Sequence, residues 1–287
     1  PDLLAKTADV TSTMFVSTAA ARMSEKEIIA CAILPKTGSI SDRPKWVYGA
    51  QRAGYGKIMG MIASALLLAF LPYASSPEAE RVSSRQVGEW IDACERELDT
   101  LHGFVLLRHG KVGSEGAWAP FDTLNVPHFL SSHSKCFITT AIGFLVEDDK
   151  LDLDERVVDI FPDKIPSNPS ENLRMLRVRD LLTMNTGTVR DGWLDDIDGD
   201  WTKAILAKEL VRRPGNGFRY DSGATHLLGV IVSRRSGKPV MEFLKERLFS
   251  RIGIEKAWTT YDPTGEACTG WGFNMTTREI SLIGQLY

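Results

Sequence analysis

The stretch Pro127–Glu147 reads PHFLSSHSKCFITTAIGFLVE. It predicts the central helix around which we expect the rest of the chain to fold. It places Ser132 three residues before Lys135, a spacing that puts both side chains on one face of a helix, one turn apart. The residues after Lys135 are apolar almost all round, which predicts a buried helix rather than a surface helix. Ser131 and Ser132 are suitable N-cap residues, so we expect the helix to begin there.

A serine and a lysine placed in this way have a chemical use. A serine hydroxyl is a poor nucleophile at neutral pH and needs a base to take its proton. Lys135 can be that base when it is neutral, and burial in a medium of low dielectric constant favours a neutral lysine. The N–H groups of the first helical turn can also help to hold an oxyanion. Alone the spacing is weak evidence for a catalytic pair, because it arises about once by chance in a chain of this length. Its position before a buried helix makes the evidence stronger.

The composition excludes several classes of function. The chain has 287 residues, of which 43% are hydrophobic and 25% charged, as expected for a globular protein with one large domain or two small ones. A formal net charge of -3 provides no overall positive field, so we expect no nucleic-acid partner. The four cysteines form no C-x-x-C pair and the five histidines no H-E-x-x-H motif, so neither a zinc site nor a disulfide scaffold is predicted.

The first part of the chain carries few regular patterns. Residues 1–56 are interrupted by Gly and Pro, and we expect a poorly ordered leader that contains at most a short helix at 19–32. The chain begins with proline, so we expect its natural start elsewhere, with Met59 and Met61 as candidates.

Residues 58–74 form an uncharged, mainly apolar run within a hydrophobic segment that we place at 57–76. The run has three interpretations, namely a signal peptide, an uncleaved membrane anchor and a buried helix. A signal or an anchor would imply association with a membrane and a location in the cell envelope or outside the cell. A buried helix would leave the protein in the cytoplasm. The remaining residues, 77–287, are predicted to form the globular domain.

Helices and strands follow one another clearly from residue 77 onward. Ser83 is expected to cap a helix that runs to about residue 98, and 104–107 and 112–118 are predicted strands joined by a tight turn at His109-Gly110. After the Ser132 helix, residues from about 151 to 213 are predicted to be mostly helical, with the last helix at 201–212.

Two further segments contribute candidate site residues. Residues 218–223 read FRYDSG before another helix, and Tyr220 on such a loop can point into a cleft, although a turn tyrosine often only packs its ring. A phenol titrates near ~10, and a cationic lysine beside it would lower its pKa. Residues 191–201 carry five aspartates around Trp193, at a spacing unlike that of a calcium loop. We therefore expect a solvated loop at the mouth of the site, with Trp193 as a candidate substrate-binding residue.

These motifs together resemble those of the serine β-lactamase and penicillin-binding-protein superfamily. The resemblance rests on S-x-x-K at 132–135, on the triplet YDS at 220–222, on LLTM at 181–184 and on GWG at 270–272, and it runs from about residue 71 to the end of the chain. The chain is most similar to the class C-type branch, which includes esterases, D-amino-acid peptidases and 6-aminohexanoate-dimer hydrolases.

The resemblance implies a role for each candidate residue. Ser132 would be the acylated nucleophile, Lys135 its proton partner and Tyr220 a second general base. Ser222 would be a substrate-binding residue, and it stands where the family usually has asparagine. This departure concerns how a substrate amide would be held, not the nucleophile. The fold implied is α/β (α+β), an antiparallel sheet flanked by helices with a mostly helical subdomain. Its third motif and last strands are expected beyond Tyr287, so the domain is expected to be incomplete.

We therefore predict a serine hydrolase that forms an acyl-enzyme on Ser132 and acts on a small-molecule ester or amide, with no metal or organic cofactor. The α/β-hydrolase class is disfavoured because the chain contains no G-x-S-x-G motif. The alternative is a non-catalytic or penicillin-binding sensor, which would keep the cleft but release an acyl group slowly or not at all.

Overall fold

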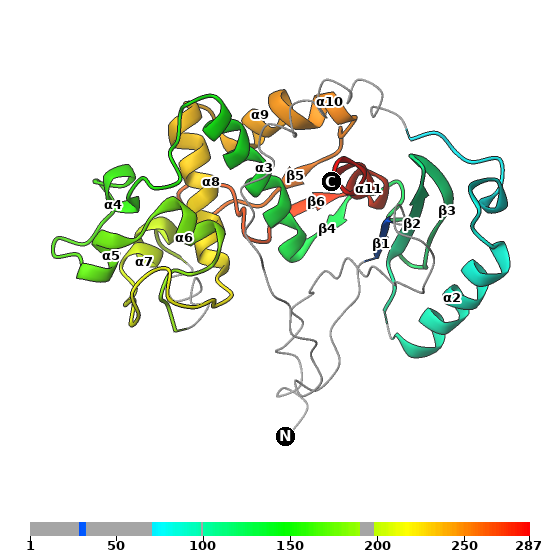
Figure 1. Ribbon diagram of the computed structural model, residues 1–287, viewed down its shortest axis with the longest axis horizontal. Helices are drawn as coiled ribbons and strands as arrows, with labels where there is room; N and C mark the ends of the chain where they lie inside the picture. The colour runs from blue at the N-terminus through cyan, green and yellow to red at the C-terminus, as the bar shows by residue number, and fades with distance from the viewer. Residues whose placement is uncertain (1–28, 33–70, 99, 190–197) are drawn as a thin grey trace. The chain divides into compact units, whose positions relative to one another are not determined.

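The computed structural model describes residues 29–32, 71–98, 100–189 and 198–287 (Figure 1). These residues belong to two compact units, which are considered separately. Unit 1 contains the described residues up to His128 together with Arg251–Lys256 and Met275–Tyr287, and unit 2 contains Phe129–Ser250 and Ala257–Asn274. Most of the predicted leader, the apolar run as far as residue 70, and Trp193 lie outside the described residues.

Two described pieces of the early chain are extended. Residues 29–32, predicted at the end of a helix, instead form strand β1 (Ile29–Ala32), which pairs antiparallel with the next strand of the sheet. The backbone after residue 70 continues this sheet, because Ala74 N–H donates to Val112 O at 2.9 Å and Val112 N–H donates to Pro72 O at 2.8 Å. Backbone pairing therefore decides the structure of these short apolar stretches. Among the helices of the described residues, none has the length and apolar character to cross a membrane.

The sheet of unit 1 has the order β1-β2-β3, with β2 at Gly103–Arg108 and β3 at Lys111–Ala117. The predicted two-residue turn is present, since Arg108 pairs with Lys111 and both central residues, His109 and Gly110, have positive φ angles of 51° and 74°. Positive φ at both positions is the type I′ geometry that matches the twist of paired strands. The prediction of this hairpin from the sequence is confirmed.

Helices cover the sheet of unit 1. Helix α2 (Ser84–Glu97) begins after Ser83, whose side chain accepts from Gln86 N–H as predicted for a cap. The Trp90 ring of α2 meets the Phe104 ring of β2 edge to face, with centroids 5.1 Å apart. Helix α11 (Thr277–Leu286) packs against β1 and β2. A short 3₁₀ helix, η2 (Pro77–Glu80), precedes α2.

The buried carboxylate of Glu279 ties together two distant segments of unit 1. Its Oε2 accepts from Thr276 N–H at 2.9 Å and from Thr276 Oγ1 at 3.1 Å, which completes a capping box at the start of α11. Its Oε1 accepts from the N–H groups of Glu255 and Lys256 at 2.8 and 2.6 Å. One side chain therefore satisfies three backbone donors that would otherwise lose their partners.

Unit 2 is built around two central helices, α3 and α8, which pack side by side (Figure 1). Helices α6, α7 and α9 pack on α8 in turn. The helices of this part of the chain are η3 (Ser131–His133), α3 (Ser134–Glu147), α4 (Val157–Ile160), α5 (Glu171–Met175), α6 (Val178–Leu182), α7 (Trp201–Leu206), α8 (Ser222–Ser236), α9 (Val240–Leu244), a π-helical turn (Lys245–Phe249) and α10 (Ser250–Ile252), which ends in unit 1.

The predicted helical subdomain is present as α4 to α7, but its last helix is shorter than expected. The sequence predicts a helix over 201–212, whereas α7 ends at Leu206. The residues that follow bond to other segments. Asn172 Nδ2 donates to Leu210 O at 2.6 Å, and Arg212 N–H donates to Gly187 O at 3.2 Å. These long-range hydrogen bonds replace the helical ones.

A second sheet has the order β4-β6-β5, from β4 (His128–Phe129), β6 (Phe273–Met275) and β5 (Trp258–Thr259). Strands this short give no alternating pattern in the sequence, and they are not predicted. The predicted α+β class is confirmed, with the strands divided between two small sheets instead of one.

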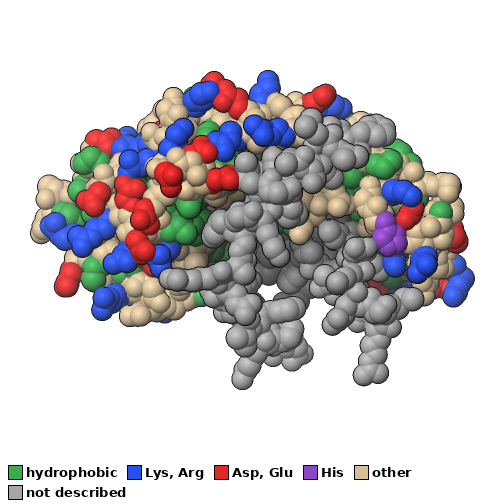
Figure 2. Space-filling view, turned by 45° about the horizontal axis from the view of Figure 1, so that its top comes forward, with side chains coloured by type: hydrophobic (Ala, Val, Ile, Leu, Met, Phe, Trp, Pro, Cys, Tyr) green, Lys and Arg blue, Asp and Glu red, His purple; other side chains and the backbone are tan. Residues whose placement is uncertain are grey.

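The described surface mixes charges of both signs. On the described part of the face shown in Figure 2, Lys and Arg side chains alternate with Asp and Glu side chains. This mixture agrees with the small net charge of -3. A mixed surface provides little long-range attraction for a polyanion such as nucleic acid.

The role of Glu279 predicts a specific loss of stability. In Glu279→Gln an amide NH₂ replaces one carboxylate oxygen and faces backbone N–H groups, so we expect the free energy of unfolding to fall by about 1–3 kcal/mol. Urea unfolding of the two proteins measures this difference. Glu255→Gln is the control, because that side chain is exposed. Equal effects of the two substitutions would contradict the role given to Glu279.

Candidate active site

Ser132 lies in the 3₁₀ turn η3, directly before α3. The expectation that Ser131 or Ser132 caps this helix is wrong. The cap position of η3 is Leu130 and that of α3 is His133, and neither makes a side-chain capping bond. The Ser132 hydroxyl is instead turned toward the side chains of Lys135 and Tyr220.

The turn that carries Ser132 is clamped to strand β6. Ser134 Oγ donates to Ser131 O at 2.7 Å and accepts from Phe273 N–H at 3.1 Å, while Leu130 N–H donates to Phe273 O at 2.9 Å. Ser131 has a φ of 49°, in the left-handed region that a residue other than glycine seldom adopts. Such backbone strain persists only where surrounding bonds hold it, and these three hydrogen bonds do so here.

Ser132, Lys135 and Tyr220 converge within unit 2, as the sequence predicts. Lys135 Nζ donates to Ser132 Oγ at 3.2 Å, and Tyr220 OH donates to the same oxygen at 2.6 Å. Lys135 Nζ also lies 4.9 Å from the centroid of the Tyr220 ring. A nucleophile and two groups able to exchange its proton are thus within direct reach. Their catalytic roles stay predictions.

Lys135 reaches two further oxygens. Its Nζ donates to Ser222 Oγ at 3.3 Å and, through a short contact, to Gly270 O. Together with Ser132 Oγ these oxygens match the three donors of an ammonium group. A neutral amine has two donors and one lone pair, so on losing a proton Lys135 can accept from Ser132 while it keeps its other two partners. Ser222, at the position where asparagine was expected, therefore helps to orient the lysine.

The buried carboxylate of Asp221 fixes the loop between Tyr220 and Ser222. Its Oδ1 accepts from Ala224 N–H at 3.1 Å as the N-cap of α8, and its Oδ2 accepts from Thr186 Oγ1 at 3.1 Å. Neither Asp221 nor Thr186 is among the predicted site residues. An aspartate directly before a helix was the available signal for the cap, whereas no local signal predicts the contact with Thr186.

Gly270 was singled out only as part of the GWG motif, and the structure explains why a glycine is needed. A Cβ atom at this position would lie 2.7 Å from the backbone oxygen of Ser222. Real Cβ atoms essentially never approach so closely, so a side chain would push the two segments apart. The carbonyl that accepts from Lys135 can therefore reach its place because residue 270 has no side chain.

Unit 2 contains two buried histidines, His133 directly after Ser132 and His226 on α8. Burial lowers the pKa of His133 and that of His226 to about 4, although Asp262, with Oδ2 at 3.6 Å from His226 Nε2, opposes the second shift. Both rings are therefore neutral at pH 7. They pack against aromatic rings, His133 on Phe137 and His226 on Trp201, with centroids 5.6 and 5.7 Å apart.

Trp193, the predicted substrate-binding residue, lies outside the described residues. Across the described ranges, no three His, Cys, Asp or Glu side chains gather in a way that could hold a metal ion. The side chains that meet at Ser132 carry amine and phenol groups, from Lys135 and Tyr220.

Comparison with known proteins relates this geometry to a family. The family model described as Beta-lactamase matches residues 92–283. The 6-aminohexanoate-dimer hydrolase of Paenarthrobacter ureafaciens is 26% identical over 203 residues, which cover 64% of this chain and 50% of that protein. The D-aminopeptidase of Brucella anthropi is 26% identical over 208 residues, which cover 63% of this chain and 38% of that protein. The chain thus spans half or less of the length of these curated relatives.

The fold also matches solved structures. A Bacillus anthracis protein assigned as a 6-aminohexanoate-dimer hydrolase superposes with a TM-score of 0.60 at 21% sequence identity. The match covers 76% of this chain and 62% of that chain. At this level of identity the likeness concerns the fold alone.

The packing at Gly270 predicts the effect of a single methyl group. In Gly270→Ala the new Cβ must displace the Ser222 backbone, which moves the carbonyl away from Lys135. We expect the rate of covalent labelling of Ser132 to fall at least about tenfold, or about 1.4 kcal/mol. Gly143→Ala, in α3 where a Cβ meets no atom within 4 Å, is the control and should label normally. Equal rates in the two variants would contradict this account.

The buried histidines predict acid sensitivity. Their folded-state pKa of about 4 lies below the ordinary value of 6.5, so the unfolded chain binds protons first as the pH falls. Stability should therefore be lost between pH 6.5 and 4, by on the order of 3 kcal/mol for each ring. His133→Phe should flatten the dependence of the unfolding free energy on pH in that window. Parallel curves for the variant and the parent would show that His133 is not responsible.

Proposed function

Because the chain belongs to the beta-lactamase family, we propose that it is a serine hydrolase that forms an acyl-enzyme on Ser132 and acts on a small-molecule amide. The observation that carries this proposal is the contact of Ser132 Oγ with both Lys135 Nζ, at 3.2 Å, and Tyr220 OH, at 2.6 Å. A serine with two such neighbours can release its proton as it attacks a carbonyl carbon.

In the proposed reaction, Ser132 Oγ forms a bond to the carbonyl carbon of the substrate and its proton passes to neutral Lys135. The carbonyl oxygen takes up the electron pair, and the N–H of Ser132, in the first turn of η3, is one donor available to it. The tetrahedral intermediate then collapses and the C–N bond breaks. The departing nitrogen receives a proton through Tyr220 OH, and Lys135 replaces that proton.

Water completes the proposed cycle. It attacks the acyl carbon of the ester on Ser132, and its proton passes through Tyr220 to the lysine. The C–O bond to Ser132 breaks, the acid leaves and the hydroxyl is restored with a proton from Lys135. The Tyr220 side chain is 41% exposed, so water can reach it. Proton transfer of this kind typically contributes 10²–10⁴-fold to the rate.

The relatives support an amide as the natural substrate, since their names are those of a 6-aminohexanoate-dimer hydrolase and a D-aminopeptidase. An ester passes through the same acyl-enzyme and has a better leaving group. Esters are therefore suitable probes, and an ester substrate remains part of the proposal.

We also propose that residues 58–74 direct the protein to the cell envelope or out of the cell, as a signal or an anchor. The support is their composition, an uncharged and mainly apolar run directly after Lys57. Fractionation of cells that produce the chain with and without these residues tests this location. Recovery of both forms in the cytoplasm would overturn it.

Covalent labelling tests the proposed nucleophile. A fluorophosphonate should add its mass to the tryptic peptide that contains Ser132, and Ser132→Ala should abolish the addition. Lys135→Ala and Tyr220→Phe should slow it at least about 10²-fold, since each removes a group that exchanges the serine proton. Ser84→Ala, at an exposed serine of α2, should label at the parental rate.

Two results would change this assignment. Labelling that survives Ser132→Ala would place the nucleophile at another serine. A burst of nitrophenol from a nitrophenyl ester, without subsequent turnover, would support the alternative of a sensor that traps an acyl group.

A further inference from the structure

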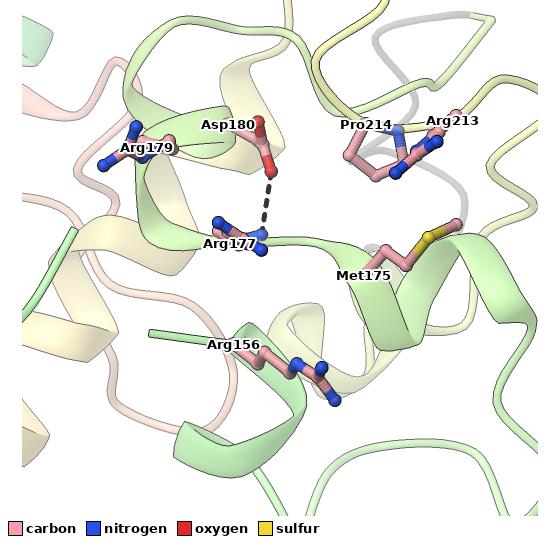
Figure 3. Close-up of a pocket in the computed structure, with 7 residues that line it drawn as sticks. All are labelled: Arg156, Met175, Arg177, Arg179, Asp180, Arg213 and Pro214. Carbon is pink, nitrogen blue, oxygen red and sulfur yellow. Dashed lines mark hydrogen bonds between the residues drawn. The ribbon is translucent and has the colours of Figure 1, made fainter. Parts of the chain in front are cut away.

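The helical part of unit 2 contains a cavity of about 270 Å³ that has no part in the proposed reaction. None of its lining residues is Ser132, Lys135 or Tyr220. Four of the seven residues that line it are arginines (Figure 3). The full lining is Arg156, Met175, Arg177, Arg179, Asp180, Arg213 and Pro214.

The acidic groups nearby neutralise part of this charge. Asp154 receives Arg177 Nη1 on one carboxylate oxygen at 2.8 Å and Arg179 Nη2 on the other at 2.5 Å. Figure 3 shows the Arg179 guanidinium turned away from the other lining side chains. Asp180 Oδ2 accepts from Arg177 N–H at 2.9 Å, as part of the cap of α6.

Two of the four arginines have no acidic partner among the described residues. Within the described part of the chain, neither Arg156 nor Arg213 forms an ion pair, although both are exposed to solvent. In Figure 3 Arg213 lies beside Pro214 and above Met175, and Arg156 lies below Arg177.

The backbone brings like charges together at this site. Arg156 and Arg177 lie opposite each other in an isolated antiparallel bridge. Like charges at directly opposite positions are destabilising. Asp154 already pairs with Arg177, and an anion bound at Arg156 would offset the rest of this repulsion, because a guanidinium fork matches the oxygens of a phosphate or carboxylate particularly well.

We propose that this cavity binds a small organic phosphate in its dianionic form. The phosphate oxygens accept from the guanidinium groups of Arg156 and Arg213. The two negative charges of the phosphate are thus balanced by two arginines that have no acidic partner among the described residues. The organic part lies against Met175 and Pro214, the apolar members of the lining. A volume of about 270 Å³ is slightly below the range found for small-molecule sites, about 300–1,000 Å³, which suits a compact ester rather than a nucleotide.

Calorimetric titration of the full chain with phenyl phosphate tests this site. The titration is done at pH 8, where the phosphate is dianionic because its second pKa is about 6, and at low constant ionic strength, because salt screens exposed charges. We expect saturable binding with one site per chain. Arg156→Gln and Arg213→Gln should each weaken it about tenfold, or about 1.4 kcal/mol.

Arg174→Gln is the matched control, since it removes the same charge from an exposed neighbour that does not line the cavity. It should leave the affinity unchanged. Benzoate, which offers the same ring on a single negative charge, should bind at least about tenfold more weakly than phenyl phosphate, and inorganic phosphate should bind more weakly because it has no apolar part. Circular dichroism confirms that the variants are folded.

Several results would overturn the proposal. Absence of saturable binding would show that the cavity takes no free phosphate ester. Equal losses of affinity for phenyl phosphate in Arg174→Gln and in the two cavity variants would show that only the net charge of the protein matters. Benzoate binding as tight as that of phenyl phosphate would exclude a dianion site. Binding to vesicles containing phosphatidic acid, without binding of phenyl phosphate, would assign the surface to a lipid.

Discussion

The structure of unit 2 depends on one lysine amine and the three oxygens that surround it. Lys135 Nζ meets Ser132 Oγ, Ser222 Oγ and Gly270 O, which come from the turn η3, from the start of α8 and from the loop before β6. A polar group that is partly removed from water must keep such partners, because an unsatisfied donor or acceptor is costly. The three segments are thus held in one arrangement around the amine, and the same arrangement brings the serine within its reach.

Apolar packing provides the platform for this contact. Phe137, Ile138 and Leu145 of α3 have no measurable exposure, and α3 packs directly on α8. Close-packed interiors resist small displacements. The buried part of α3 therefore holds the polar start of the helix in a fixed position, so that its hydrogen bonds can form. The same packing supports the strained backbone at Ser131.

The sequence predicts those parts of the molecule that are encoded by neighbouring residues. The spacing of Ser132 and Lys135 before an apolar run predicts the buried helix, and His109-Gly110 predicts the hairpin. The contacts that finish the site join residues far apart in the chain, such as Ser134 with Phe273 and Lys135 with Gly270, and no local pattern encodes them. A candidate cap at Ser24 and an apolar stripe predict a short helix over 19–32, but pairing with β2 places residues 29–32 in a strand.

The link between Ser134 and Phe273 has a consequence for the order of folding. The two residues are 139 positions apart, and the entropy of closing so long a loop must be overcome before their hydrogen bond forms. Helix α3 has local contacts and can form early, whereas the backbone around Ser131 lacks its two hydrogen bonds to Phe273 until β6 is in place. The turn that carries Ser132 therefore reaches its final conformation in a late step, after most of the surrounding helices are in place.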